Sequence, residues 1–168
     1  MIFNKSVGLV LVFVACTGFG YTKYLELKNH LNALQELRQI FYTLRSELQY
    51  TRATFEEIFG KMGKKFDNPF GRWLEGLQRE LKEKNGKSFF SIWKKSIDEE
   101  VEGFYLKKED LDELKEIGKN LEHFEHIDLF IEQLEYKIQR TREDYETKGK
   151  LYRSFGIMSG VFLVILLL

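Results

Sequence analysis

The chain has 168 residues, and its 26 Lys plus Arg balance its 26 Asp plus Glu, so the formal net charge is zero. A nucleic-acid-binding protein usually carries a basic excess gathered on one face, so this balance argues against a nucleic-acid partner. The only cysteine, Cys16, excludes a disulfide framework and a cysteine-based zinc site within one chain. Aromatic residues are plentiful, with 15 Phe, 8 Tyr and 2 Trp, so a hydrophobic core can form.

The amino-terminal stretch 5–22 is apolar, and Ser6 to Tyr21 carries no charge. Sixteen helical residues cover roughly 24 Å, slightly less than the ~30 Å hydrocarbon core, and snorkelling flanks absorb such a difference. We expect an amino-terminal transmembrane anchor. Two alternatives are a cleaved signal peptide, for which Ala15-Cys16-Thr17 is a loose match, and a lipoprotein signal that acylates Cys16.

A long amphipathic helix is predicted from Tyr24 to Tyr50, because apolar residues recur every three or four positions and so share one helix face. The stripe, which continues into the next helix, comprises Leu27, Leu31, Leu34, Leu37, Phe41, Leu44, Leu48, Thr51, Phe55, Ile58 and Met62. A second stripe at the same period comprises Ile127, Ile131, Leu134, Ile138, Thr141, Tyr145, Lys148 and Tyr152. We expect the two long helices to pair in antiparallel orientation.

Shorter helices are predicted between the two long ones. Thr54 and Glu57 form a capping box, so the first helix should break near Thr51 to Ala53 and a new one should follow. Asp67-Asn68-Pro69 and Ser88 read as later helix starts. The expected short helices are Phe55 to Met62, Pro69 to about Lys84, Ser88 to Gly103, and one with Glu109 and Asp110 in its first turn. No alternating strand pattern occurs, so the predicted fold is all-α, a bundle of about six helices.

The carboxyl-terminal stretch 153–168 ends in an uninterrupted apolar run without a polar face. We expect a second transmembrane segment there; the alternative is a buried core helix. The basic residues on the side of the central region are Lys23, Lys28, Lys148, Lys150 and Arg153, against Lys5 and the amino terminus on the other side. Because positive flanks remain in the cytoplasm, residues 23–152 should form a cytosolic domain at the cell membrane.

Catalytic motifs are absent from the sequence. His123 and His126 lie among Glu122, Glu125 and Asp128, which resembles half of a carboxylate-histidine metal site, but the second Glu-x-x-His motif is missing. We interpret both as structural histidines; the alternative is a membrane-bound metalloenzyme. There is also no glycine-rich phosphate loop and no Gly-x-Ser-x-Gly motif. We therefore expect no enzyme, cofactor or small-molecule substrate.

The order of these features resembles the stage III sporulation protein AB family across nearly the whole chain. The family pattern combines an amino-terminal anchor, a long Leu-x-x-Leu helix, a tryptophan helix, an Leu-x-x-Glu-Asp-Leu helix and a glycine-containing apolar end. The matching residues are Leu34, Leu37, Glu47, Leu48, Tyr50, Trp93, Glu109, Asp110, Leu111, Leu114, Gly118, Leu121 and Gly156 to Leu168. The chain departs from the family at the first helix break, where Thr51, Ala53 and Thr54 replace glycine, threonine and proline.

The resemblance implies a non-catalytic platform in the channel complex between mother cell and forespore, related to the platform protein of type II secretion. Its implied partners are a cytosolic assembly ATPase and other membrane subunits. A platform anchored at both ends would present its membrane-distal tip to the ATPase. We expect this tip to comprise the junctions near Thr51 to Thr54, Asp67 to Arg72 and His123 to Asp128. The expected docking residues are Arg52, Lys64, Lys65, Arg72, Glu122, Glu125 and Asp128. The alternative function is an exported or lipid-anchored helical binding module.

Overall fold

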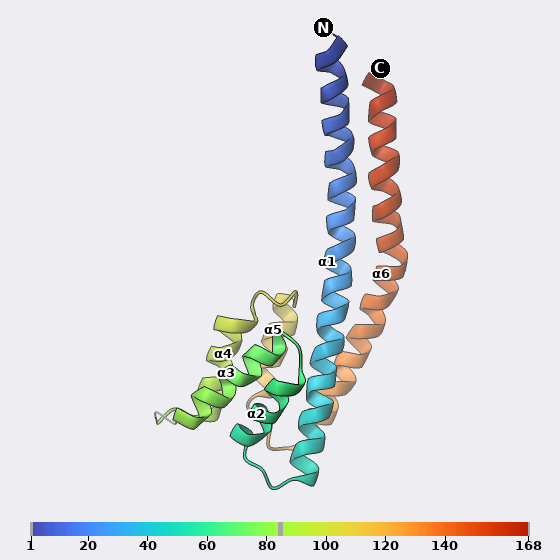
Figure 1. Ribbon diagram of the computed structural model, residues 1–168. Coiled ribbons are helices and arrows are strands. Elements are labelled where there is room, and N and C mark those ends of the chain that lie inside the picture. The colour runs from blue at the N-terminus through green and yellow to red at the C-terminus, as the bar shows by residue number, and fades with distance from the viewer. Residues whose placement is uncertain (1, 84–85, 168) are drawn as a thin grey trace. The chain divides into compact units, whose positions relative to one another are not determined.

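The computed structural model describes the backbone of residues 2–83 and 86–167, and every element in these ranges is helical (Figure 1). Toward the two ends of the chain, many side chains lie outside this description. The elements are α1 (Ile2–Tyr50), α2 (Phe55–Lys65), α3 (Phe70–Glu83), α4 (Phe89–Ser96), the π-helical turn η1 (Ile97–Val101), α5 (Lys108–Ile117) and α6 (Phe124–Leu167). The predicted all-α class with six helices is confirmed.

The chain forms two compact units, one built from the segments up to Leu31 and from Gln139 onward, the other from Asn32–Ile138. In the larger unit, Phe41 packs on Phe130 with ring centroids 4.5 Å apart, and Tyr42 donates a 2.8 Å hydrogen bond to Glu135. In the smaller unit, the hydroxyls of Tyr24 and Tyr145 lie 2.6 Å apart. In the larger unit, Arg38 pairs with Glu135 and Arg45 with Asp128, so α1 and α6 run antiparallel there, as the two stripes predicted.

The predicted stripe of α1 forms the centre of the larger unit's core. Leu34, Leu37, Phe41 and Leu44 are at most 1% exposed. The stripe of α6 is likewise buried at Ile127, Ile131, Leu134, Ile138 and Thr141. Lys148 is a correction: it is exposed and pairs with Asp144 at 2.7 Å, because an ammonium group gains more from water and a carboxylate than from a helix seam.

Trp93 of α4 contacts most of the other helices of the larger unit. Its fully buried ring contacts Phe41, Phe59 and Trp73, with ring centroids 5.3 to 6.4 Å away. Its indole Nε1 donates a 2.8 Å hydrogen bond to the carbonyl of Leu114. One side chain of α4 thus contacts α1, α2, α3 and α5, which fixes the short helices on one side of α1 (Figure 1).

Local capping explains where the short helices begin. Thr54 accepts a hydrogen bond from the Glu57 amide, and the Glu57 carboxylate accepts one from the Thr54 amide, so the predicted capping box is present. Ser88 caps α4 in the same way through the Ser91 amide. Helix α2 runs three residues past the expected Met62, to Lys65, and the π-helical turn η1 was not predicted.

The expected membrane segments 5–22 and 153–168 fall on parts of α1 and α6 in which most side chains lie outside the description. A search of the described residues finds no helix with the length and apolar character needed to cross a membrane.

Candidate functional site

The seven expected docking residues all lie in the larger unit, but they do not form one surface. Arg52 lies in the loop between α1 and α2, beside Ala53, which lines a groove of about 410 Å³ together with Lys61 and Lys64. Lys61 pairs at 3.5 Å with Glu47 in the last turn of α1, which holds α2 against the end of that helix. Arg52 and Lys64 therefore belong to a basic group near the end of α1.

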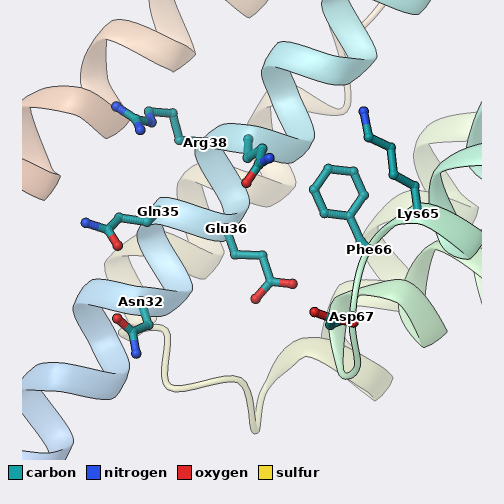
Figure 2. Close-up of a pocket in the computed structure, with 8 residues that line it drawn as sticks. Asn32, Gln35, Glu36, Arg38, Lys65, Phe66 and Asp67 are labelled. Carbon is teal, nitrogen blue, oxygen red and sulfur yellow. The ribbon is translucent and has the colours of Figure 1, made fainter.

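Lys65 and Arg72 lie at the α2–α3 junction, which is a different place. Lys65, Phe66 and Asp67 line a groove of about 600 Å³ together with the α1 segment 32–39 (Figure 2). That segment ends eleven residues before Tyr50, which is roughly 16 Å along a helix. The expectation that residues 67–72 share a tip with residues 51–54 is therefore not met, because α2 itself runs back from the end of α1 and ends beside its middle.

Glycine allows the close packing of α3 on α2. Gly63 on α2 faces Gly71 on α3, and a Cβ added at Gly71 would lie 2.2 Å from the carbonyl oxygen of Phe66 and 2.9 Å from that of Gly63. The two backbones approach so closely that no other residue fits at Gly71 without a shift.

The α2–α3 junction groove places two carboxylates near each other. Figure 2 shows Glu36 of α1 directed across the groove toward Asp67. Partial burial raises the pKa of Glu36, and the negative charge of Asp67 raises it further. The Glu36 carboxylate has no hydrogen bond or ion pair within the described part of the chain, so no cation or donor there compensates its charged form.

Glu122, Glu125 and Asp128 surround the start of α6. Asp128 accepts a 3.0 Å hydrogen bond from Arg45 and forms an ion pair with it, so its charge is already matched within the chain. Glu122 and Glu125 are exposed, and the structure gives neither of them an ion pair among the residues it describes. This group lies beside the last turns of α1, as does the loop that carries Arg52.

A charge asymmetry within the larger unit was not anticipated from the overall balance. Between Asp98 and Glu135 the sequence holds fourteen acidic and four basic residues, whereas residues 52–95 hold six acidic and eleven basic ones. Most of these side chains are exposed. A running sum of charge along the sequence would have revealed the asymmetry. The charge of the larger unit is therefore distributed unevenly along its sequence, with an excess of basic residues in one segment and of acidic residues in the other.

His123 and His126 lie side by side with ring centroids 5.9 Å apart, and both are exposed. Among the described residues, no group of three or more His, Cys, Asp or Glu side chains is placed to hold a metal ion.

Comparison with known proteins gives one consistent result. Residues 5–168 match the model of the family described as stage III sporulation protein AB. The chain is similar to stage III sporulation protein AB of Bacillus subtilis (strain 168), with 22% identity over 170 residues that cover 98% of this chain and 99% of the relative. A solved structure of a stage III sporulation protein AB matches 70% of this chain and 96% of its own, with a TM-score of 0.65 and 20% identity. At this identity the solved structure supports the fold alone.

Proposed function

Because the chain belongs to the stage III sporulation protein AB family, we propose that it is a non-catalytic membrane platform component in sporulating cells. It acts in the channel complex between mother cell and forespore, in the mother-cell membrane, with residues 23–152 in the cytosol. The observation that carries this proposal is the family match across residues 5–168, which is nearly the whole chain.

Membrane attachment through both ends is part of the proposal. It is supported by the charge-free run Ser6 to Tyr21, the apolar end 153–168 and the basic residues that flank them. Removing residues 155–168 should leave a protein that still sediments with membranes, and removing residues 1–20 as well should release it. Sedimentation of the doubly truncated protein with membranes would contradict attachment through the ends.

An assembly ATPase is the proposed cytosolic partner, and exposed charges without intramolecular partners are its contact points. Arg52 and Lys64 near the end of α1, Lys65 and Arg72 at the α2–α3 junction, and Glu122 and Glu125 at the start of α6 are exposed. None of these six has an ion pair in the described part of the chain. Asp128 contributes less, because Arg45 already neutralises it.

The separation of the two basic groups makes the docking test specific. Arg52→Glu with Lys64→Glu reverses the group near the end of α1, and Lys65→Glu with Arg72→Glu reverses the group at the junction. Lys82→Glu with Lys94→Glu is the matched control, because both lysines are exposed and lie on α3 and α4, outside these groups. Loss of ATPase co-purification in one test pair but not in the control locates the contact. Equal binding by all three variants would refute docking at these charges.

The membrane topology of the protein distinguishes the exported or lipid-anchored alternative from the proposed cytosolic domain. Protease added to intact cells digests an exported domain but spares a cytosolic one. Digestion in this assay would overturn the cytosolic placement.

A further inference from the structure

A groove in the smaller unit has the chemistry of an anion site. It encloses about 490 Å³ between α1 and α6 and is lined by Tyr24, Tyr145, Glu146, Gly149, Lys150 and Ser154. Gly149 lets the Tyr24 ring approach the α6 backbone, because a Cβ there would lie 3.2 Å from the ring carbon Cδ2. The two tyrosines meet at the groove with ring centroids 5.3 Å apart.

The tyrosine hydroxyls leave one hydrogen available to a ligand. They are 2.6 Å apart, so one donates its hydrogen to the other, and the accepting hydroxyl retains its own hydrogen for a third atom. The hydrogen bond to Tyr24 raises the pKa of Tyr145, so this phenol stays protonated at neutral pH. Ser154 adds a further exposed hydroxyl to the groove. These groups can donate to phosphate oxygens.

Positive charge without a partner lies at the same groove. Lys150 is exposed and has no hydrogen bond or ion pair in the part of the chain that the structure describes. Lys28 follows Tyr24 by four residues, so it lies on the same face of α1, and it too is exposed and unpaired among the described residues. Lys148, by contrast, is paired with Asp144 at 2.7 Å. Glu146 is the one acidic residue in the lining.

The surroundings of the groove point to lipid as the source of the anion. The helices of this unit expose large apolar side chains, among them Phe19 at 67%, Met158 at 69%, Phe162 at 64% and Ile165 at 67%. Exposed apolar surface of this kind marks a contact with lipid or protein. Tyrosine and lysine directly beside apolar runs form the belt that proteins place at the level of lipid headgroups.

We propose that this groove binds the phosphate of an anionic phospholipid headgroup, with Lys150 as its cation and the Tyr24–Tyr145 pair as its hydrogen-bond donor. This inference rests on the proposed membrane attachment and adds the class of lipid. Glu146 repels the negatively charged headgroup and lowers the affinity, so the proposal predicts that removing this charge strengthens binding.

The test uses the full-length protein in detergent micelles, with phosphatidylglycerol or phosphatidylcholine titrated and the bound lipid counted by native mass spectrometry. Lys150→Gln should weaken phosphatidylglycerol binding about fivefold, the factor that ~1 kcal/mol per basic residue at an anionic surface corresponds to. Glu146→Gln should tighten it. Lys148→Gln is the matched control and should change it less than twofold, because that charge is already engaged.

Three results would overturn the assignment: equal losses for Lys150→Gln and Lys148→Gln, weaker binding by Glu146→Gln, or equal affinity for phosphatidylcholine. Displacement of the lipid by soluble glycerol 1-phosphate at comparable concentration would instead assign the groove to a soluble phosphate ester. Flotation of the same variants with phosphatidylglycerol vesicles separates this inference from the proposed function. Flotation without lipid selectivity refutes only the groove, whereas failure of the unaltered protein to float refutes membrane attachment.

Discussion

Replacing Gly118 by alanine should destabilise the larger unit, because the added methyl group would collide with Trp93. A Cβ at Gly118 would lie 2.1 Å from ring carbon Cδ1 and 2.6 Å from Nε1 of Trp93. The Trp93 ring cannot simply move away, because it is 1% exposed and packs on Phe41, Phe59 and Trp73. The collision also falls on the indole that donates to the Leu114 carbonyl.

That hydrogen bond exists because the last turn of α5 tightens. The Gly118 amide donates to the Lys115 carbonyl at 3.2 Å, which leaves the Leu114 carbonyl for the indole. Overpacking of a core costs typically 1–3 kcal/mol, and a buried polar group left without its partner costs about 1–3 kcal/mol more. The opposing gain, from alanine's better helix propensity, is at most about 1 kcal/mol. We expect a net loss of about 2–5 kcal/mol.

Chemical denaturation followed by tryptophan fluorescence measures this loss as a shift of the unfolding midpoint. A double-mutant cycle with Trp93→Phe tests the cause, because a smaller ring without an indole NH should reduce the penalty of Gly118→Ala. A variant as stable as the unaltered protein, or a penalty that is unchanged in the Trp93→Phe background, would refute the collision.

Further predictions concern the packing of α1 on α6, the buried ion pair of Asp110 and the α2–α3 junction groove. Leu44→Ala should lower the free energy of unfolding by about 2–5 kcal/mol in the same assay, and a loss below about 0.5 kcal/mol would place Leu44 outside the core. Asp110 is 5% exposed, accepts a hydrogen bond from the Lys107 amide and pairs with Lys137, so Asp110→Ala should lower the free energy of unfolding by about 3 kcal/mol. Glu113→Ala removes only a half-exposed partner of Lys137 and should lower it by about 1 kcal/mol or less. Equal losses for the two variants would contradict this ranking. Burial and the charge of Asp67 raise the pKa of Glu36 above its ordinary value of 4.5, so the folded state favours the protonated carboxyl. The stability that this form contributes is present below pH 4.5 and is lost as the pH rises through the raised pKa. Glu36→Gln should therefore stabilise the protein at pH 7 and not at pH 4, and destabilisation at pH 7 in thermal unfolding would reverse this account.

Much of the fold follows from one-dimensional patterns. The spacing of Leu34, Leu37, Phe41 and Leu44 fixes the buried face of α1, and the Thr54 to Glu57 capping box marks the start of α2. These signals are local: a stripe requires only helical periodicity, and a cap requires only residues three positions apart. The same spacing failed at Lys148, where residue type should have outweighed position.

The arrangement of the candidate docking residues was harder to predict, because it depends on packing between helices. The prediction grouped Arg52 with Arg72 as if every junction lay at the same level. Helix α2 instead runs back along α1 to its middle, and the close contact of Gly63 with Gly71 packs α3 against α2. Short glycine spacings allow such an approach, but they do not specify which two helices make it. The π-helical turn after Ser96 likewise has no local signature that periodicity detects.

The charge asymmetry of the larger unit means that a formally neutral chain contains segments of opposite charge. Net charge governs how a protein migrates in an electric field, but an approaching partner responds to the nearest surface. A partner with a positive contact surface is drawn toward the segment 98–135, and one with a negative contact surface toward the segment 52–95, before any side chains touch. The association rate of each should fall steeply as salt shortens the range of the field, to about 8 Å at physiological ionic strength. Two oppositely charged partners are thus each attracted to a different segment of the same small domain.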